Sequence, residues 1–178
     1  MAIRHDAIMA GVGGKGALTI AQVLAQAGMS EYKYVLWYPN YTTARRGAPC
    51  DATIILSEEE ITSPLVFQVE SLILVEPSRL KPFEPRVQSG GLLVVESFGL
   101  KDEVERKDVK VIKVPGVEIA AKLGDTQVGN FVLLGAYLEA TRVIPPELIE
   151  GEIERRYKGN ERMMLLNIKA FEEGLKLG

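Results

Sequence analysis

Cysteine and histidine are almost absent from this sequence: Cys50 and His5 are the only residues of their kinds among 178. A disulfide needs two cysteines and an iron–sulfur cluster is usually held by four, so this chain can form neither by itself. A Cys–His or Ser–His catalytic pair would have to use His5, which stands at the start of the first predicted strand. We expect a structural role for both residues, and we predict no catalytic residue and no metal site in this chain.

Long apolar runs are also missing, because none approaches the roughly 20 residues that span a bilayer. The N-terminus, Met1 to Asp6, carries charge directly before a short apolar segment, without the long apolar core and cleavage site of a signal peptide. A net charge of −3 gives no general attraction to nucleic acid or to anionic membranes. We therefore expect a cytoplasmic protein, with neither nucleic acid nor membrane among its partners.

What is present is a regular alternation of strand-like and helix-like segments. A content of 47% hydrophobic and 25% charged residues is typical of a soluble globular protein, and we expect one domain over residues 1–178. The alternation predicts an α/β fold, with a Rossmann-like, mostly parallel sheet and helices on both faces. Strands are predicted at 7–10, 34–38, 52–56, 72–75, 92–95 and 109–114, the last at an edge.

The C-terminal part, from Pro115 onward, is predicted to be helical. Asp125 is a candidate helix cap. Residues 128–138 are apolar almost all round, which is typical of a helix buried against the core or against another subunit. A last helix is predicted at 162–176. Earlier in the chain, three glutamates after Ser57 fit a capping box, so a helix start is favoured there over a metal site.

Gly11, Gly13 and Gly16 match the G-x-G-x-x-G motif between a predicted strand and a predicted helix. Such glycines permit a tight turn, the approach of a phosphate and close helix–strand packing. However, the second predicted strand ends at residues 36–39 without the acid that would hold a ribose. No Ser or Thr follows Lys15, so this is not a Walker A loop. An anion-binding or partner-facing loop is favoured over a dinucleotide site, and close packing alone remains an alternative.

A second glycine-bearing loop follows the second predicted strand. It runs from Tyr41 to Pro49 and contains Thr42, Arg46 and Gly47. Because ligands of open α/β sheets bind at the carboxyl ends of strands, the two loops should lie close together. Arginines beside hydroxyl groups suit phosphate or carboxylate recognition, with a solvated or intersubunit ion pair as an equal alternative.

Five short motifs follow one another along nearly the whole chain. They are GVGGKG at 11–16, the tyrosine loop ending Arg46-Gly47-Ala48, Ser57 with ITSP at 61–64, N-x-x-x-L-G-A from Asn130 and N-x-x-A-F-x-x-G from Asn167. Together they resemble the gamma subunit of 2-oxoacid:ferredoxin oxidoreductases, which include the pyruvate, 2-oxoisovalerate and 2-oxoglutarate enzymes; the indolepyruvate enzyme has a related subunit. Lys15 and Ala48 depart from this pattern, since the family has glutamine and glycine there.

The resemblance implies an accessory subunit of a hetero-oligomeric oxidoreductase, inactive alone, with alpha-, beta- and delta-type partners. The complex would oxidatively decarboxylate a 2-oxoacid, join the acyl group to coenzyme A and reduce ferredoxin. Thiamine diphosphate, Mg and the iron–sulfur clusters are expected on the partners, in agreement with the single cysteine. The two loops would line the interface near thiamine diphosphate or coenzyme A. The implied cofactor-binding residues are Gly11, Gly13, Gly14, Lys15, Gly16, Tyr41, Thr42, Arg46, Gly47 and Asn130.

Two other functions stay open on the sequence. A stand-alone reductase that binds NAD(P) or a flavin dinucleotide would rest on the G-x-G-x-x-G motif alone. A purely structural assembly subunit would use the apolar helix at 128–138 in a subunit contact.

Overall fold

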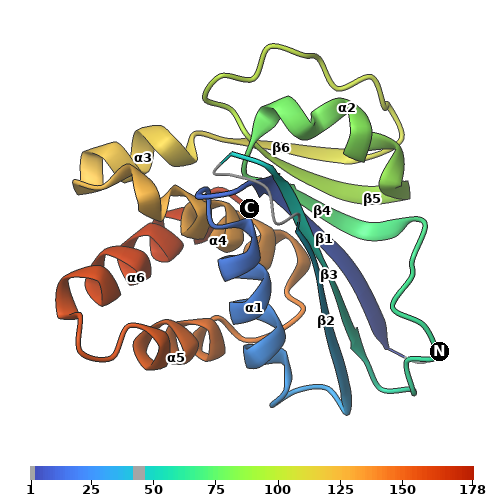
Figure 1. Cartoon of the computed structure of the whole chain (residues 1–178), viewed down its shortest axis with the longest axis horizontal. Coiled ribbons are helices and arrows are strands. Elements are labelled where there is room, and N and C mark those ends of the chain that lie inside the picture. Colours follow the sequence, from blue (N-terminus) through green and yellow to red (C-terminus); the bar gives the residue numbers. More distant parts are fainter. Residues whose placement is uncertain (1–2, 42–46) are drawn as a thin grey trace.

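The computed structural model of the chain describes residues 3–41 and 47–178, and these residues form a six-stranded sheet (Figure 1). The strands are β1 (Arg4–Val12), β2 (Tyr34–Tyr41), β3 (Pro49–Ser57), β4 (Val69–Leu74), β5 (Val87–Glu96) and β6 (Lys110–Val114). They lie in the order β2-β3-β1-β4-β5-β6. β1, β4, β5 and β6 are parallel, whereas β3 is antiparallel to both of its neighbours. The predicted mostly parallel α/β sheet is confirmed, with β6 as an edge strand.

Helices cover both faces of this sheet, as predicted, but unequally. The helices in the described residues are α1 (Ala17–Gly28), α2 (Leu80–Phe83), α3 (Gly116–Leu123), α4 (Gly129–Thr141), α5 (Pro146–Arg156) and α6 (Glu161–Leu175). Figure 1 shows α1, α4, α5 and α6 gathered on one side of the sheet and the short α2 on the other. The central strands β4 and β5 therefore lie between two apolar cores, which explains their continuous apolar runs.

Helix α4 is the centre of the larger core. Its residues from Gly129 to Leu138 are all buried, as the uniformly apolar sequence predicts. A Cβ at Gly135 would collide with the carbonyl oxygen of Phe171, and one at Gly174 with that of Val132. These two glycines thus let the backbones of α4 and α6 touch. The helix is buried within this chain, so its apolar surface does not require another subunit.

The predicted helix start at Ser57 is wrong. Ser57 ends β3, and its hydroxyl accepts a hydrogen bond from Glu59 N at 3.0 Å and donates one to Glu59 O at 2.8 Å. The side chain closes a local turn, an alternative that serine offers the backbone in competition with a helix. Residues 58–68 then return to β4 without a helix. In contrast, Asp125 does cap a helical turn, since its carboxylate accepts from Gln127 N at 2.9 Å.

The helices of the described residues were also assessed for their capacity to cross a bilayer. None of them is long and apolar enough to do so.

Candidate functional site

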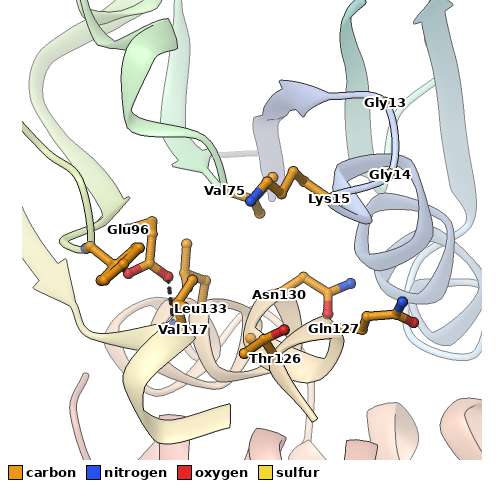
Figure 2. Close-up of a pocket in the computed structure, with 12 residues that line it drawn as sticks. Gly13, Gly14, Lys15, Val75, Glu96, Val117, Thr126, Gln127, Asn130 and Leu133 are labelled. Atoms are coloured by element: carbon orange, nitrogen blue, oxygen red, sulfur yellow. Dashed lines mark hydrogen bonds between the residues drawn. The ribbon is translucent and has the colours of Figure 1, made fainter. Parts of the chain in front are cut away.

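A pocket of about 490 Å³ lies at the carboxyl ends of β1, β4 and β5. The chain leaves β1 for helix α1 on one face of the sheet and leaves β4 for α2 on the other, so the pocket lies at the switch point where α/β folds bind ligands. Figure 2 shows the Gly13–Lys15 loop above it and the first residues of α4 below it. Its lining residues are Gly13, Gly14, Lys15, Val75, Glu96, Phe98, Val117, Thr126, Gln127, Gly129, Asn130 and Leu133.

The first glycine loop owes its shape to close packing and to positive φ angles. A Cβ at Gly11 would lie 2.5 Å from Val75 Cγ2, so any larger residue there would have to displace the Val75 side chain. Gly14 and Gly16 have φ angles of 94° and 77°, a region that other residues adopt at a cost of about 1–2 kcal/mol. Lys15 N donates to Val12 O at 3.1 Å and tightens the turn. The loop therefore holds the Lys15 side chain over the pocket (Figure 2).

The two glycine-bearing loops lie side by side, as the sequence predicts. Gly13 N donates to Ala48 O at 2.8 Å, and a Cβ at Gly13 would lie 3.5 Å from Gly47 N. Of the other predicted residues of the second loop, Thr42 and Arg46 lie outside the described residues, together with the side chain of Tyr41.

The position of β3 beside β1 explains why the glycine motif lacks its ribose acid. In a dinucleotide-binding unit the acid ends the parallel strand beside the first strand. Here β3 occupies that place, runs antiparallel, and presents its beginning, Pro49 and Cys50, at this edge. The Gly13 N–H, which would face a pyrophosphate, is already bonded to Ala48 O. The pocket opens instead on the other side of β1, toward β4 and β5.

Asn130 joins the first loop to α4. Its Nδ2 donates to Gly16 O at 3.2 Å, so two of the sequence motifs meet in one hydrogen bond. The residue is 8% exposed, and its Oδ1 is buried with no hydrogen-bond partner among the described residues. A buried acceptor without a donor costs free energy.

Glu96 is a pocket residue that the sequence analysis missed. It is 2% exposed, and its Oε1 and Oε2 accept from Phe98 N at 2.8 Å and from Val117 N at 3.0 Å. Burial raises the pKa of this carboxyl group, although the backbone N–H groups oppose the shift. The available signal was its place directly after the buried run 92–95, because the carboxyl end of such a strand faces the ligand edge.

A second cavity, of about 330 Å³, lies at the opposite, amino edge of the parallel strands. His5 Nδ1 lies 3.1 Å from Glu70 Oε2, and Ser71 Oγ donates to the hydroxyl of the buried Tyr137 at 3.4 Å. Thr141, in the last turn of α4, also lines this cavity. The structural role expected for His5 is consistent with this ion-pair geometry.

The described residues contain no group of three or more His, Cys, Asp or Glu side chains that could hold a metal ion. Cys50 is buried, and burial raises the pKa of its thiol, so it is a poor thiolate donor. The residues of this chain do not fit an iron–sulfur cluster, which is usually held by four thiolates.

The family model described as pyruvate ferredoxin/flavodoxin oxidoreductase matches residues 6–177. Among relatives, the common gamma subunit of pyruvate/ketoisovalerate oxidoreductases from Thermococcus litoralis is 30% identical over 84% of both chains. The 2-oxoglutarate synthase subunit KorC from Methanothermobacter marburgensis is 29% identical over 98% of this chain and 97% of its own. The ketoisovalerate oxidoreductase subunit VorA of the same organism is 28% identical over 93% of this chain, which spans only 35% of that relative.

Solved structures share the fold along the whole chain. The subunit PORC of pyruvate oxidoreductase from Thermotoga maritima has a TM-score of 0.81 at 25% identity, covering 98% of this chain and 96% of that one. The 2-oxoglutarate:ferredoxin oxidoreductase from Magnetococcus marinus, with 2-oxoglutarate, coenzyme A and succinyl-CoA bound, has a TM-score of 0.87 at 18% identity. The match with the Magnetococcus marinus enzyme covers 98% of this chain and 31% of that one.

Proposed function

Because this chain belongs to the pyruvate ferredoxin/flavodoxin oxidoreductase family, we propose that it is the gamma-type subunit of a 2-oxoacid:ferredoxin oxidoreductase. The assembled enzyme would oxidatively decarboxylate a 2-oxoacid, join the acyl group to coenzyme A and reduce ferredoxin. The observation that carries this assignment is the match over residues 6–177, together with gamma-subunit relatives that align over most of both chains. The chain would work in the cytoplasm beside alpha-, beta- and delta-type subunits.

The chemistry of the side chains supports an accessory role, with the redox and thiamine centres on the partners. One buried cysteine does not suffice for an iron–sulfur cluster. Glu96 is the one carboxylate among the residues that line the pocket, and both of its oxygens already accept backbone hydrogen bonds. A Mg–diphosphate centre takes one or two free carboxylates as ligands, which this pocket does not offer.

We further propose that the cofactor-facing surface is formed by the two loops and the start of α4. In the assembled enzyme this surface would contact phosphate groups of coenzyme A or of thiamine diphosphate. Lys15 supplies the cation, and the contact of Gly13 with Ala48 and of Gly16 with Asn130 holds the three segments together. The family resemblance adds Tyr41, Thr42, Arg46 and Gly47 to this surface.

The relatives carry the names of three different 2-oxoacids: pyruvate, ketoisovalerate and 2-oxoglutarate. Since their identities to this chain are so similar, we propose that selectivity for the acid side chain lies on the partner subunits. The single domain over residues 1–178 would then provide a common module.

The test is reconstitution of the complex with and without this chain. We expect 2-oxoacid-dependent ferredoxin reduction to require the chain, and full activity without it would show the assignment to be wrong. A purely structural subunit is the second candidate. It would be favoured if Lys15→Ala left assembly, turnover and coenzyme A affinity unchanged.

The stand-alone dinucleotide reductase is disfavoured by the position of β3, which fills the place of the ribose-binding strand. Calorimetric titration of the full chain with NAD(P) and FAD checks this, and we expect no binding of any of them.

A further inference from the structure

Segment 61–68, which leads from β3 to β4, is an uncharged stretch that leaves two large apolar side chains in solvent. Its sequence is ITSPLVFQ, and it follows three glutamates. Leu65 is 76% exposed and Phe67 84%, the highest fractions among the large apolar residues of the described part of the chain. Val66, between them, packs against the smaller apolar core on the α2 side of the sheet. The segment therefore turns one side chain inward and presents its two neighbours outward.

The backbone that carries these side chains is held in place by hydrogen bonds. Arg86 donates from Nε to Phe67 O and from Nη2 to Val66 O, each at 2.8 Å. Leu65 N donates to Ser63 Oγ at 3.1 Å. In Figure 1 the segment lies at the margin of the molecule between β3 and β4, and no helix of the described residues covers it. A fixed backbone lowers the entropy lost on association, which suits side chains that anchor an interface.

Arg86 adds a positive charge beside the two apolar side chains. Two of its five N–H donors bond to the carbonyl oxygens of the segment, and within the described residues it forms no ion pair with a carboxylate. An arginine beside exposed aromatic and aliphatic groups is typical of the residues that dominate binding energy at interfaces. Leu65, Phe67 and Arg86 are called the docking patch below. A protein that covers this patch needs an apolar pocket with a carboxylate at its rim.

The charge of the docking patch disfavours a second copy of this chain as its partner. In a two-fold contact centred on the patch, the same surface of both copies meets, so Arg86 would approach its own counterpart. Like charges at close range oppose such a contact. In the VorA relative, by contrast, the matching part is 35% of a longer chain, so further polypeptide is available there to cover this module.

We propose that the docking patch binds another subunit of the oxidoreductase, which receives Leu65 and Phe67 in an apolar pocket and pairs a carboxylate with Arg86. This inference rests on the proposed function, because it requires the other subunits. The patch is separate from the cofactor-facing surface, since segment 61–68 precedes the amino end of β4 whereas that surface lies at the carboxyl ends of the strands. Within the ITSP motif, Ser63 then has the task of holding Leu65 in position.

Binding of the chain to the purified complex of the other subunits, measured by biolayer interferometry, tests the proposal. We expect the double variant Leu65→Ser/Phe67→Ser to bind at least about tenfold more weakly, because both apolar anchors are lost. Met29→Ser is the matched control, because Met29 is 70% exposed at the end of α1 and its substitution should leave the affinity unchanged. Since the two anchors are exposed, the double variant should keep the thermal unfolding midpoint of the natural chain.

The salt dependence of binding tests the role of Arg86 separately. An ion pair with a partner carboxylate is screened by salt, so we expect the affinity to fall less steeply with salt in Arg86→Gln than in the natural chain. Arg86→Lys keeps the charge and should keep the steeper dependence. A merely structural role in holding the segment would not produce this difference between the two variants. The same salt dependence in Arg86→Gln as in the natural chain would overturn the proposed ion pair.

The remaining outcomes separate this inference from the proposed function. If the double variant binds as tightly as the natural chain, or if Met29→Ser loses as much affinity, the docking patch is wrong and the subunit assignment stands. If the natural chain does not bind the other subunits at all, both are wrong. Sedimentation velocity of the chain alone tests for a second copy, and a dimer that the double variant abolishes would overturn the proposal in favour of self-association.

Discussion

One cavity lies at the carboxyl ends of the parallel strands, the carboxyl edge, and the other lies at their amino ends, the amino edge. Helix α4 runs from one cavity to the other. Gly129 and Asn130, in its first turn, line the carboxyl-edge pocket, whereas Ala140 and Thr141, in its last turn, line the amino-edge cavity. The positive end of the helix dipole therefore faces one cavity and the negative end the other.

The polar groups of the two cavities are also satisfied differently. At the amino edge, His5 lies against Glu70, and Ser71 bonds to Tyr137, so the side chains pair with one another. At the carboxyl edge, the start of α1 lacks a side-chain cap among the described residues, and Asn130 Oδ1 has no partner there. The lesson is that the polar side chains at the amino edge stabilise the fold by pairing with one another, whereas the carboxyl edge leaves Asn130 Oδ1 without a partner among the described residues.

The largest expected difference in stability between the two edges comes from substituting two glycines that have the same φ of 77°. Gly16 lies at the carboxyl edge and Gly90 at the amino edge. A Cβ at Gly16 would collide with the Asn130 amide, whereas a Cβ at Gly90 has open space. We expect Gly16→Ala to cost about 2–4 kcal/mol, from backbone strain plus overpacking, and Gly90→Ala about 1–2 kcal/mol from strain alone. Denaturant unfolding measures both. Equal losses would show that Asn130 simply moves aside.

A smaller difference in stability is expected between substitutions of Glu96, at the carboxyl edge, and Glu70, at the amino edge. In Glu96→Gln the side chain keeps only one acceptor oxygen, so one of the two backbone N–H groups that bond to Glu96 loses its partner. We therefore expect a loss of about 1–3 kcal/mol in the free energy of unfolding. Glu70→Gln, whose side chain is 44% exposed, should change it by less than about 0.5 kcal/mol. A larger effect at Glu70 would contradict this comparison.

The pH dependence of stability should distinguish Glu96 as well. Its pKa in the folded protein lies above the ordinary value of 4.5 because of burial, so the folded state holds the proton more tightly than the unfolded state. Stability is therefore expected to fall as the pH rises from 4.5 through the raised pKa. Unfolding curves across this range should show a smaller decline in Glu96→Gln than in the natural protein, because burial also raises the pKa values of Asp51 and Glu150, which remain in the variant.

A smaller loss of stability than for Glu96→Gln is expected at the amino edge, where Tyr137→Phe removes a long hydrogen bond from Ser71. At 3.4 Å this bond is weak, and we expect a loss of about 0.5–1 kcal/mol at neutral pH. Tyr32→Phe, which removes a 2.7 Å bond to Val143 O, should cost more and serves as the reference. A larger loss for Tyr137→Phe would show that its hydroxyl does more than satisfy Ser71.

Alkaline unfolding sharpens the same comparison. Burial raises the pKa of Tyr137 from 10.0 to about 12, so the folded state keeps its proton where the unfolded state loses it. Stability is thus expected to fall as the pH rises from 10 toward 12. Tyr137→Phe should remove that part of the decline, which thermal unfolding at several alkaline pH values would measure.

The local pattern predicted most of the strands and the buried helix, because apolar periodicity reports burial directly. It failed at Ser57, where a side-chain turn competes with a helix over a few residues. It found the glycine loop, and the family resemblance added Asn130, yet both missed Glu96 and Phe98, which approach the pocket only through the end of β5. Residues from five segments meet there, and no local signal links them.

By itself, the sequence determined the α/β alternation, the inability to hold a metal–sulfur cluster and the resemblance to the oxidoreductase gamma subunits. These follow from residue counts, periodicity and short motifs, which need no knowledge of neighbours in space. Only the tertiary structure decided that β3 runs antiparallel beside β1, which fills the ribose position and opens the pocket toward β4 and β5. Strand order is set by long-range packing of the whole sheet, so GVGGKG acquired its meaning only when its neighbours were in place.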